Sequence, residues 1–181
     1  MDFFDSDILI ETEHLILKNA KPEDKMDVFN NIVHDKNVLK YYVWKYQENP
    51  EDFNFQKTLD YYRDNKMYFL TMQIKDTREV IGIIHQCNAY NKIMDYVEIG
   101  YAEGRKYWNR GYMTEALRAF VNLLTERGVH RIEISHIKEN VPSGKVIKKC
   151  GFSFEYEKED GIFYHDRYWD TLHYCIINKK K

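Results

Sequence analysis

The sequence lacks the features that define several large classes of protein. Only three of its 181 residues are cysteines, and none belongs to a C-x-x-C pair, so neither a disulfide framework nor a zinc site is indicated. No stretch approaches the roughly 18 consecutive apolar residues that a membrane-spanning helix needs. The amino-terminal stretch M-D-F-F-D-S-D is acidic and has no long apolar run, unlike a signal peptide. We therefore expect a cytoplasmic protein that binds neither a metal nor a membrane.

An excess of positive charge is also absent. The 27 Lys and Arg residues are balanced by 29 Asp and Glu residues, and the formal net charge of -2 provides no basic field for nucleic acid. The hydrophobic (44%) and charged (31%) fractions are those of a soluble globular protein, and the length suits one domain, here residues 1–181. Aromatic residues, by contrast, are frequent. The 15 Tyr and 10 Phe residues serve either a core or an aromatic-lined substrate cleft.

Hydrophobic periodicity divides the chain into extended and helical segments. Short polar turns favour an antiparallel meander in the middle of the chain. A helical segment then separates two extended runs, which predicts a parallel pair with a right-handed crossover. We predict a mixed α/β sheet of about seven strands, mostly antiparallel with this central parallel pair, flanked by about four helices. The expected strands are 14–19, 67–74, 80–90, 94–102, 131–137, 152–157 and 168–177, and an acidic turn joins the last two. The first expected helix begins near Lys21. The other three cover 38–65, which Asn49-Pro50 divides, 114–127 and 142–150.

The stretch Y-W-N-R-G-Y-M-T-E-A, residues 107–116, has the composition of an anion-binding loop. Gly111 lets the backbone approach a ligand closely and adopt a positive φ. The helix expected to follow would present free backbone N–H groups, and Arg105, Lys106 and Arg110 add positive charge. A single glycine before a helix is, however, more often an ordinary turn. Neither the G-K-[ST] of a P-loop nor a G-x-G-x-x-G fingerprint is present.

Together with two further motifs, this stretch resembles the acetyl-CoA pyrophosphate loop of the GNAT superfamily of N-acetyltransferases, and especially its RimJ/RimL-type branch. In that branch the loop commonly reads W-G-K-G-Y-A-T-E-A. The motif E-I-G-Y at residues 98–101 resembles the strand before that loop, and Asn140-x-x-Ser143 with K-C-G-F at 149–152 resembles the branch's N-x-x-S followed by K-x-G-F. The resemblance covers about residues 80–177 and implies a GNAT-like domain in which the two central parallel strands splay apart.

The resemblance also implies acetyl-CoA as the co-substrate and assigns residues to it. Tyr101 and Ala102 would offer their backbone to the pantetheine arm, and Asn140 and Ser143 would lie near that arm and the thioester sulfur. Helix capping is the alternative for Asn140 and Ser143. The pyrophosphate would be held by the loop and the first helical turn, formed by Trp108, Asn109, Arg110, Gly111, Tyr112, Met113 and Thr114.

The sequence departs from the family pattern at three places. Met113 stands where the wider superfamily has Gly or Ala, so a side chain there would change the fit around the phosphates. Ile147 stands where many relatives have a tyrosine general acid. Ile162 lies near the place of a glutamate that serves as the base in some members of the branch. The acid–base residues therefore cannot be carried over from relatives.

Chemical need suggests other candidates for catalysis. Acetyl transfer requires a neutral amine, donors to the carbonyl oxygen and help for the leaving thiolate. Glu98 is our first candidate for the base, directly or through water, because it stands in an otherwise apolar strand; a solvent-facing glutamate is the alternative. Ser143 is a candidate donor to the sulfur. His136 and His165 have a suitable side chain, although alternation favours a core position for His136.

We predict an N-acetyltransferase that moves the acetyl group directly to a primary amine, either a protein N-terminus or a small molecule, as a monomer or homodimer. The alternative is a catalytically silent acyl-CoA-binding regulatory module, because the tyrosine and the glutamate of relatives are missing. Acidic residues could border the acceptor site or be ordinary surface charges, namely Asp35, Glu48, Glu51, Asp160 and Asp166.

Overall fold

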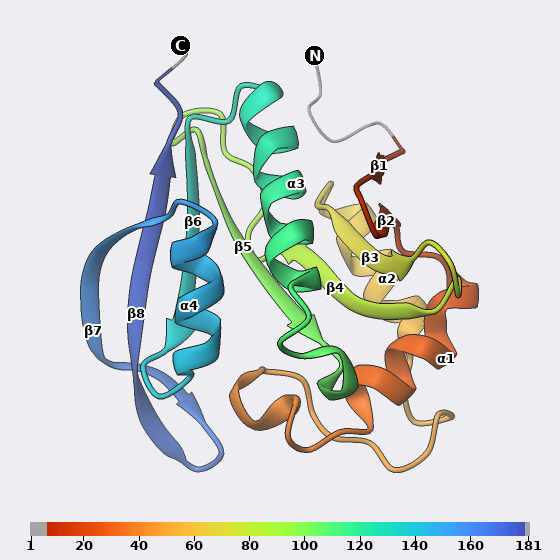
Figure 1. Ribbon diagram of the computed structural model, residues 1–181. Helices are drawn as coiled ribbons and strands as arrows, with labels where there is room; N and C mark the ends of the chain where they lie inside the picture. Colours follow the sequence, from red (N-terminus) through yellow and green to blue (C-terminus); the bar gives the residue numbers. More distant parts are fainter. Residues whose placement is uncertain (1–6, 180–181) are drawn as a thin grey trace.

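One mixed sheet with helices on both of its faces forms the protein (Figure 1). The computed structural model describes residues 7–179. The eight strands lie in the order β1-β2-β3-β4-β5-β6-β8-β7, and only the pairing of β5 with β6 is parallel in this described part of the chain. The mixed architecture predicted from the sequence is therefore confirmed. The strands are β1 (Leu9–Glu11), β2 (Leu15–Asn19), β3 (Phe69–Ile74), β4 (Val80–Gln86), β5 (Tyr96–Glu103), β6 (Arg131–Ile137), β7 (Ser153–Tyr164) and β8 (Arg167–Ile177).

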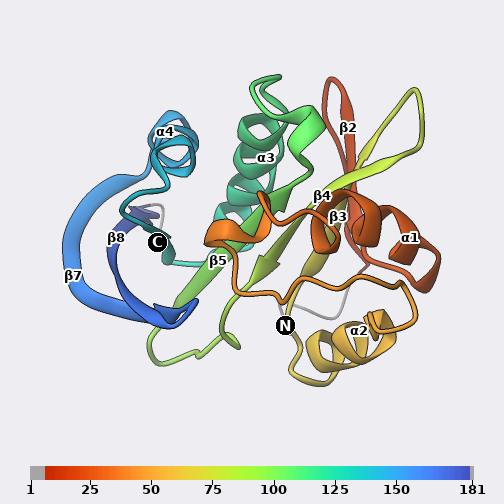
Figure 2. The same cartoon turned by 90° about the horizontal axis from the view of Figure 1, so that it is seen from below.

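Two hydrophobic cores, one on each face, hold the sheet. α3 (Tyr112–Glu126) and α4 (Val141–Lys149) cover one face, where Phe120 is fully buried. α1 (Lys25–Val28), which continues as a π-helical turn, and α2 (Phe55–Asp64) cover the other face, where Phe55 is buried. Figure 2 shows α2 and α3 on opposite sides of the strands. The short strand β1, with three residues, is an addition to the predicted sheet because so short a run carries no periodicity.

The helical region expected over residues 38–65 is wrong in its first part. A 3₁₀ turn, η3 (Leu39–Tyr41), is followed by irregular chain, and α2 begins only at Phe55. The side chain of Asn54 caps this helix by accepting a hydrogen bond from the Lys57 N–H at 3.0 Å. Ring contacts hold the irregular part, including Trp44 against Phe53 with 5.8 Å between ring centroids. Aromatic packing onto the sheet, rather than helical hydrogen bonding, therefore organises this segment.

The sequence predicted a turn at the acidic stretch near residue 160, and this prediction is wrong. β7 runs through it to Tyr164, and the hairpin reverses at His165 and Asp166, which both have a positive φ. The register with β8 shifts between Lys158 and Ile162, where Asp160 also has a positive φ of 49°. This irregularity lets the β7–β8 hairpin remain paired while it curves (Figure 1).

The parallel strands β5 and β6 separate halfway along their length. Their register begins at Tyr96 opposite Arg131 and ends at Ile99 opposite Ile134. Beyond these residues β5 remains paired with β4, and β6 with β8, so the two strands diverge towards their carboxyl ends (Figure 1). The splayed pair implied by the resemblance is confirmed, and its opening lies beside the N-termini of α3 and α4.

Candidate active site

The N-terminus of α3 forms one wall of the opening. Gly111 caps the helix with a φ of 88°, and a Cβ placed there would meet no described atom within 4 Å. No side chain caps this end of the helix, and the first intrahelical bond runs from the Glu115 N–H to the Gly111 carbonyl at 3.0 Å. The amides of the first turn, at Tyr112, Met113 and Thr114, therefore belong to the set of helix N–H groups that lack an intrahelical acceptor. This end of the helix has the chemistry of an anion site.

The side chain of Met113 does not obstruct this anion site. It is only 3% exposed and belongs to the core beneath α3. Trp108 is 42% exposed, and its indole Nε1 donates to the Glu103 carbonyl at 2.8 Å, so it braces the loop against the end of β5. The cradle is thus presented mainly by backbone, with Asn109 at a positive φ of 63° immediately before Arg110.

Two of the three positive charges of the loop form ion pairs with carboxylates. Arg105 Nε lies 3.1 Å from Asp35 Oδ2, and Lys106 Nζ lies 2.6 Å from Glu79 Oε1. The guanidinium of Arg110 lies 5.7 Å from the centroid of the Tyr107 ring. Arg110 is also the cation closest to Gly111 in the sequence, so it is the best placed of the three to meet an anion at the helix.

The N-terminus of α4 forms the other wall. Asn140 Oδ1 accepts a hydrogen bond from the Ser143 N–H at 3.4 Å, which confirms that Asn140 caps this helix. The Tyr101 hydroxyl reaches across from β5, lying 2.8 Å from Ser143 Oγ and donating to the Ser143 carbonyl at 3.2 Å. Burial raises the pKa of Tyr101 far above neutral pH, so this hydroxyl keeps its proton. The side chain of Tyr101 is a site feature that the sequence reasoning, which considered only its backbone, missed.

Glu98 lies on the opposite face of β5. Its neighbours Val97 and Ile99 point into the core beneath α3, whereas the half-buried Glu98 accepts a hydrogen bond from Ser135 Oγ at 3.2 Å. Ser135 stands on β6 just beyond the point where the strands separate. Glu98 is therefore placed beside the opening, on the face away from the anion cradle.

A histidine that the sequence reasoning missed continues this polar row. His173 on β8 lies opposite Ser135 in register, and its Nε2 is 2.9 Å from Thr171 Oγ1. The Tyr156 ring stacks on His173 with 4.4 Å between centroids. Burial lowers the pKa of His173, while the negative charge of Glu98 acts to raise it. No local motif marks His173, because its position depends on pairing between distant strands.

The two histidines considered from the sequence lie elsewhere. The His136 ring stacks on Tyr174 with 5.5 Å between centroids, and a Cβ on Gly144 of α4 would approach its Nε2 to 2.8 Å. Burial lowers the pKa of His136. It is a core histidine on the α4 face. His165 is exposed at the β7–β8 turn. Neither shares a face with Glu98. Of the acidic residues considered, Asp35 binds Arg105, and Glu48, Glu51, Asp160 and Asp166 are exposed.

A buried histidine packs against β5 next to the opening. His85 on β4 contacts Gly100 of β5, where an added Cβ would lie 3.1 Å from the imidazole ring. Its Nδ1 lies 3.0 Å from the Gln86 carbonyl, which can only accept, so Nδ1 carries the proton and Nε2 accepts from the Tyr42 hydroxyl at 2.7 Å. The Tyr62 hydroxyl lies 2.9 Å from Nδ1. Burial lowers the pKa of His85 to about 4, so the ring is neutral at physiological pH.

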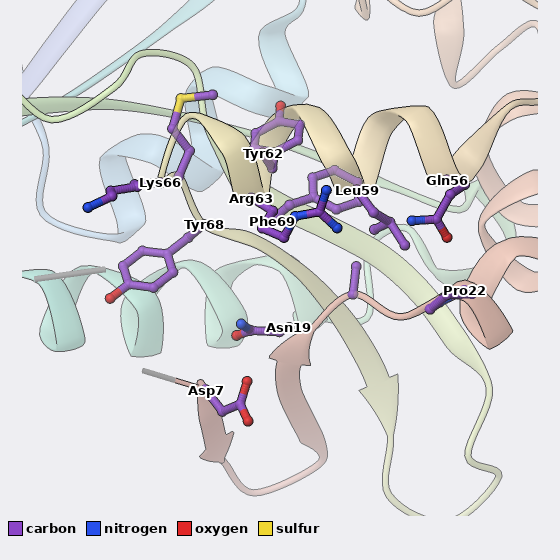
Figure 3. Close-up of a pocket in the computed structure, with 12 residues that line it drawn as sticks. Asp7, Asn19, Pro22, Gln56, Leu59, Tyr62, Arg63, Lys66, Tyr68 and Phe69 are labelled. Carbon is purple, nitrogen blue, oxygen red and sulfur yellow. The ribbon is translucent and has the colours of Figure 1, made fainter. Parts of the chain in front are cut away.

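A surface cavity of about 480 Å³ lies beside α2, and Tyr62 is one of its lining residues. It is bordered by β2, β3 and α2, and its walls include Asn19, Leu59 and Phe69 (Figure 3). None of the residues that the sequence assigned to coenzyme A or to catalysis lines it. Among the described residues, no group of three or more His, Cys, Asp or Glu side chains is arranged to hold a metal ion, and no helix is long and apolar enough to cross a membrane.

Comparison with known families gives one match that covers most of the chain. Residues 14–153 match the family described as "Acetyltransferase (GNAT) domain". The matched region includes the N-terminus of α3, the opening between β5 and β6, and the N-terminus of α4.

Individual relatives are similar over nearly the full length. The chain is 27% identical to the uncharacterized N-acetyltransferase YnaD of Bacillus subtilis, over 94% of this chain and 98% of that protein. A crystal structure of a GNAT-family acetyltransferase from Bacillus anthracis superposes with a TM-score of 0.80 and 25% identity, covering 96% of this chain and 100% of that one. A structure of RimL, a ribosomal L7/L12 α-N-protein acetyltransferase in complex with coenzyme A, shares the fold with a TM-score of 0.79 at 19% identity, over 94% and 98% of the two chains.

The hydrogen bonds around His85 predict a stability effect. Tyr42→Phe would leave the buried Nε2 of His85 without its donor, so we expect a loss of about 1–3 kcal/mol in the free energy of unfolding. The loss should be the same at pH 6 and pH 8, because a His85 pKa of about 4 keeps the ring neutral at both. Urea unfolding measures it. The matched control is Tyr46→Phe. The Tyr46 hydroxyl binds the exposed Glu48, so its removal should change the free energy of unfolding by less than about 0.5 kcal/mol. Equal, small effects of the two variants would contradict the assigned role of His85.

Proposed function

The chain belongs to the GNAT acetyltransferase family, and we propose that it transfers the acetyl group of acetyl-CoA directly to a primary amine, on a protein N-terminus or a small molecule. The observation that carries the proposal is the separation of β5 from β6 after Ile99 and Ile134, with the N-terminus of α3, capped by a glycine, beside the opening. An anion-binding helix end next to an unpaired strand edge suits a ligand that has a pyrophosphate and an amide-bearing arm.

The residues present fit coenzyme A. The empty space around Gly111 and the free amides of Tyr112 and Thr114 suit the pyrophosphate, with Arg110 as the nearby cation. Tyr101 and Ala102 would pair through their backbone with the pantetheine arm, because the edge of β5 that faces β6 has no strand partner there among the described residues. When bound, acetyl-CoA supplies an acetyl group activated as a thioester.

The two faces of the sheet suggest separate tasks. On the α4 side, the Tyr101 and Ser143 hydroxyls form a hydrogen-bonded pair that can donate a proton to a departing thiolate. On the other face, Glu98, fixed by Ser135, can take a proton from the attacking amine, directly or through water. Because the strands part between Gly100 and Ser135, the amine and the thioester can meet through the opening from opposite sides.

The groups on the Glu98 face support an amine as the acceptor. A half-buried carboxylate attracts an ammonium group, and the stacked rings of Tyr156 and His173 provide an adjoining aromatic surface. This environment suits an amine, and the name of the RimL structure, an α-N-protein acetyltransferase, makes a protein N-terminus the first acceptor to test. We keep both monomer and homodimer as predictions for the active form.

The alternative, a silent acyl-CoA-binding regulatory module, rests on Ile147 and Ile162 replacing the acid–base residues of relatives. A thiol-release assay with acetyl-CoA separates the two functions, using peptides with N-terminal alanine or serine, polyamines and amino acids as acceptors. Turnover on any of these amines supports the enzyme. Coenzyme A binding without turnover would favour the module. If the protein neither binds coenzyme A nor turns over any amine, both functions are contradicted.

Two glycines with the same conformation test the pyrophosphate cradle. Gly111 and Gly151 have φ values of 88° and 89°, and an added Cβ meets nothing within 4 Å at either. Gly111→Ala and Gly151→Ala should therefore each cost about 1–2 kcal/mol of stability through backbone strain. Relief of that strain at Gly111 displaces the helix amides, so we expect Gly111→Ala to weaken acetyl-CoA binding about tenfold, equivalent to about 1.4 kcal/mol. Calorimetric titration measures the affinity. Equal affinities of the two variants would count against the cradle.

Replacing the base tests the assignment of Glu98. We expect Glu98→Gln to lower kcat/KM for the accepted amine by about 10²–10³, because the amide cannot remove a proton, while coenzyme A affinity stays within about twofold. Glu133→Gln is the matched control, since Glu133 lies opposite Glu98 on β6 but is paired with Arg131. The initial rate of thiol release reports the effect. The assignment fails if Glu98→Gln is as active as Glu133→Gln.

A further inference from the structure

A buried carboxyl group lies inside the proposed pyrophosphate cradle. Glu103 is the last residue of β5 and lies opposite Gly82 of β4. Its side chain points to the α3 face, where the backbone N–H of Met113 in the first turn of α3 acts to lower the pKa of the carboxyl group. The oxygen Oε1 is fully buried and has no hydrogen-bond partner among the described residues. Buried carboxyl oxygens of this kind are rare and call for an explanation.

The cations of the loop are engaged with other groups, and the guanidinium of Arg110 lies over the Tyr107 ring. The lysine and arginine that follow it in the loop bind Glu79 and Asp35. On β4 the facing residue is glycine, which cannot ionise. Burial accordingly raises the pKa of Glu103 to about 8, although the Met113 N–H acts in the opposite direction. The carboxyl group is therefore mainly neutral at pH 7.

Two other ionisable groups face this region. Glu115, in the first turn of α3, is turned away towards the start of β2, where it accepts a hydrogen bond from Thr12 Oγ1 at 2.6 Å and contacts His14. Tyr101 keeps its proton because of burial, and the charge of Glu103 adds a smaller effect in the same direction. Neither group carries a positive charge that would hold Glu103 ionised.

The position of Glu103 creates a conflict with an anionic ligand. The Met113 amide is one of the helix N–H groups that a pyrophosphate at this helix would use, and it is also the group that favours the charged form of Glu103. A carboxylate at that place would also repel a phosphate. A neutral carboxylic acid has the opposite effect, because its O–H is a donor and phosphate oxygens are strong acceptors.

We propose that Glu103 makes coenzyme A binding proton-dependent: the neutral acid donates its O–H to a phosphate oxygen, whereas the carboxylate retains the Met113 amide and repels the pyrophosphate. The inference rests on the proposed function, since it assumes that coenzyme A is the ligand of this cradle.

The sign of the effect follows from proton linkage. With a pKa of about 8 in the free protein, Glu103 is neutral at pH 6.5 and largely ionised at pH 9, so affinity falls as the pH rises through 8. Without ligand, the folded state holds a proton that the unfolded state, with the ordinary value of 4.5, has released. The contribution of Glu103 to stability is therefore complete below pH 4.5 and is lost as the pH rises to about 8.

Calorimetric titration of desulfo-coenzyme A into the full-length protein between pH 6.5 and pH 9 tests the proposal. This probe lacks the thiol, so thiol ionisation does not contribute. We expect the wild-type Kd to rise about tenfold over this range, as an acid with a pKa of about 8 becomes about 90% ionised. Glu103→Gln keeps a donor and an acceptor without charge, so its Kd should change less than about twofold beyond the change common to all variants. Glu126→Gln, at the exposed opposite end of α3, should behave as the wild type.

The outcomes are distinguishable. Parallel pH dependence in the wild type and Glu103→Gln would overturn the role of Glu103 while leaving the coenzyme A site intact. Absence of binding in every variant at every pH would overturn both the role and the proposed function. Thermal unfolding without ligand gives a second readout, in which Glu103→Gln should raise the Tm relative to the wild type more at pH 8 than at pH 5. An equal shift at both values would contradict the buried, proton-bearing carboxyl group.

Discussion

The rest of the structure depends on the end of hydrogen bonding between β5 and β6 after Ile99 and Ile134. Each strand keeps its outer neighbour, β4 or β8, and two separate cores fix the sheet from both faces. The strands therefore cannot close the gap without disturbing both cores. Backbone groups left unpaired in a protein interior are costly, so a gap of this kind favours a bound partner that can take up their hydrogen bonds. In our account, the pantetheine arm of coenzyme A is that partner.

The opening also separates the chemistry into two compartments. The α3–α4 side carries the helix amides, the Tyr101–Ser143 hydroxyl pair and the buried Glu103, whereas the other side carries Glu98, Ser135 and His173. Neutral His85 fixes the segment containing Tyr42 and the helix α2 onto β4, on the side of the sheet where our proposal places the acceptor. Direct transfer needs such an arrangement, because the two reactants must approach each other through one gap with their reacting atoms aligned.

The sequence predicted the elements around the site well because each has a local signal. Gly111 and Gly128 mark the two ends of α3, and both have a positive φ. Asn140 marks the start of α4, where it caps the helix, the alternative that the sequence left open for it. These residues act through their own backbone or through neighbours three positions away, so a linear pattern contains the information. The family motifs added the splay of β5 and β6, which periodicity alone does not indicate.

The features that the sequence did not predict arise from contacts between separate elements of the fold. Glu103, His85 and His173 acquire their roles from Met113, Tyr42 and Ser135, each more than 9 positions away in the chain. The irregular chain before α2 is similar, since Trp44 and Phe53 hold it through ring packing rather than through a repeating pattern. Such residues look like ordinary core or surface positions until the register of the sheet is known.

Backbone amide chemical shifts on adding desulfo-coenzyme A test the central claim most directly, because they locate the ligand without requiring turnover. The account predicts the largest changes at residues 109–114 and at Tyr101 and Ala102, where the first turn of α3 meets the opening between β5 and β6. Changes concentrated instead around Asn19 and Phe69, in the cavity beside α2, with the α3 N-terminus unaffected, would contradict it.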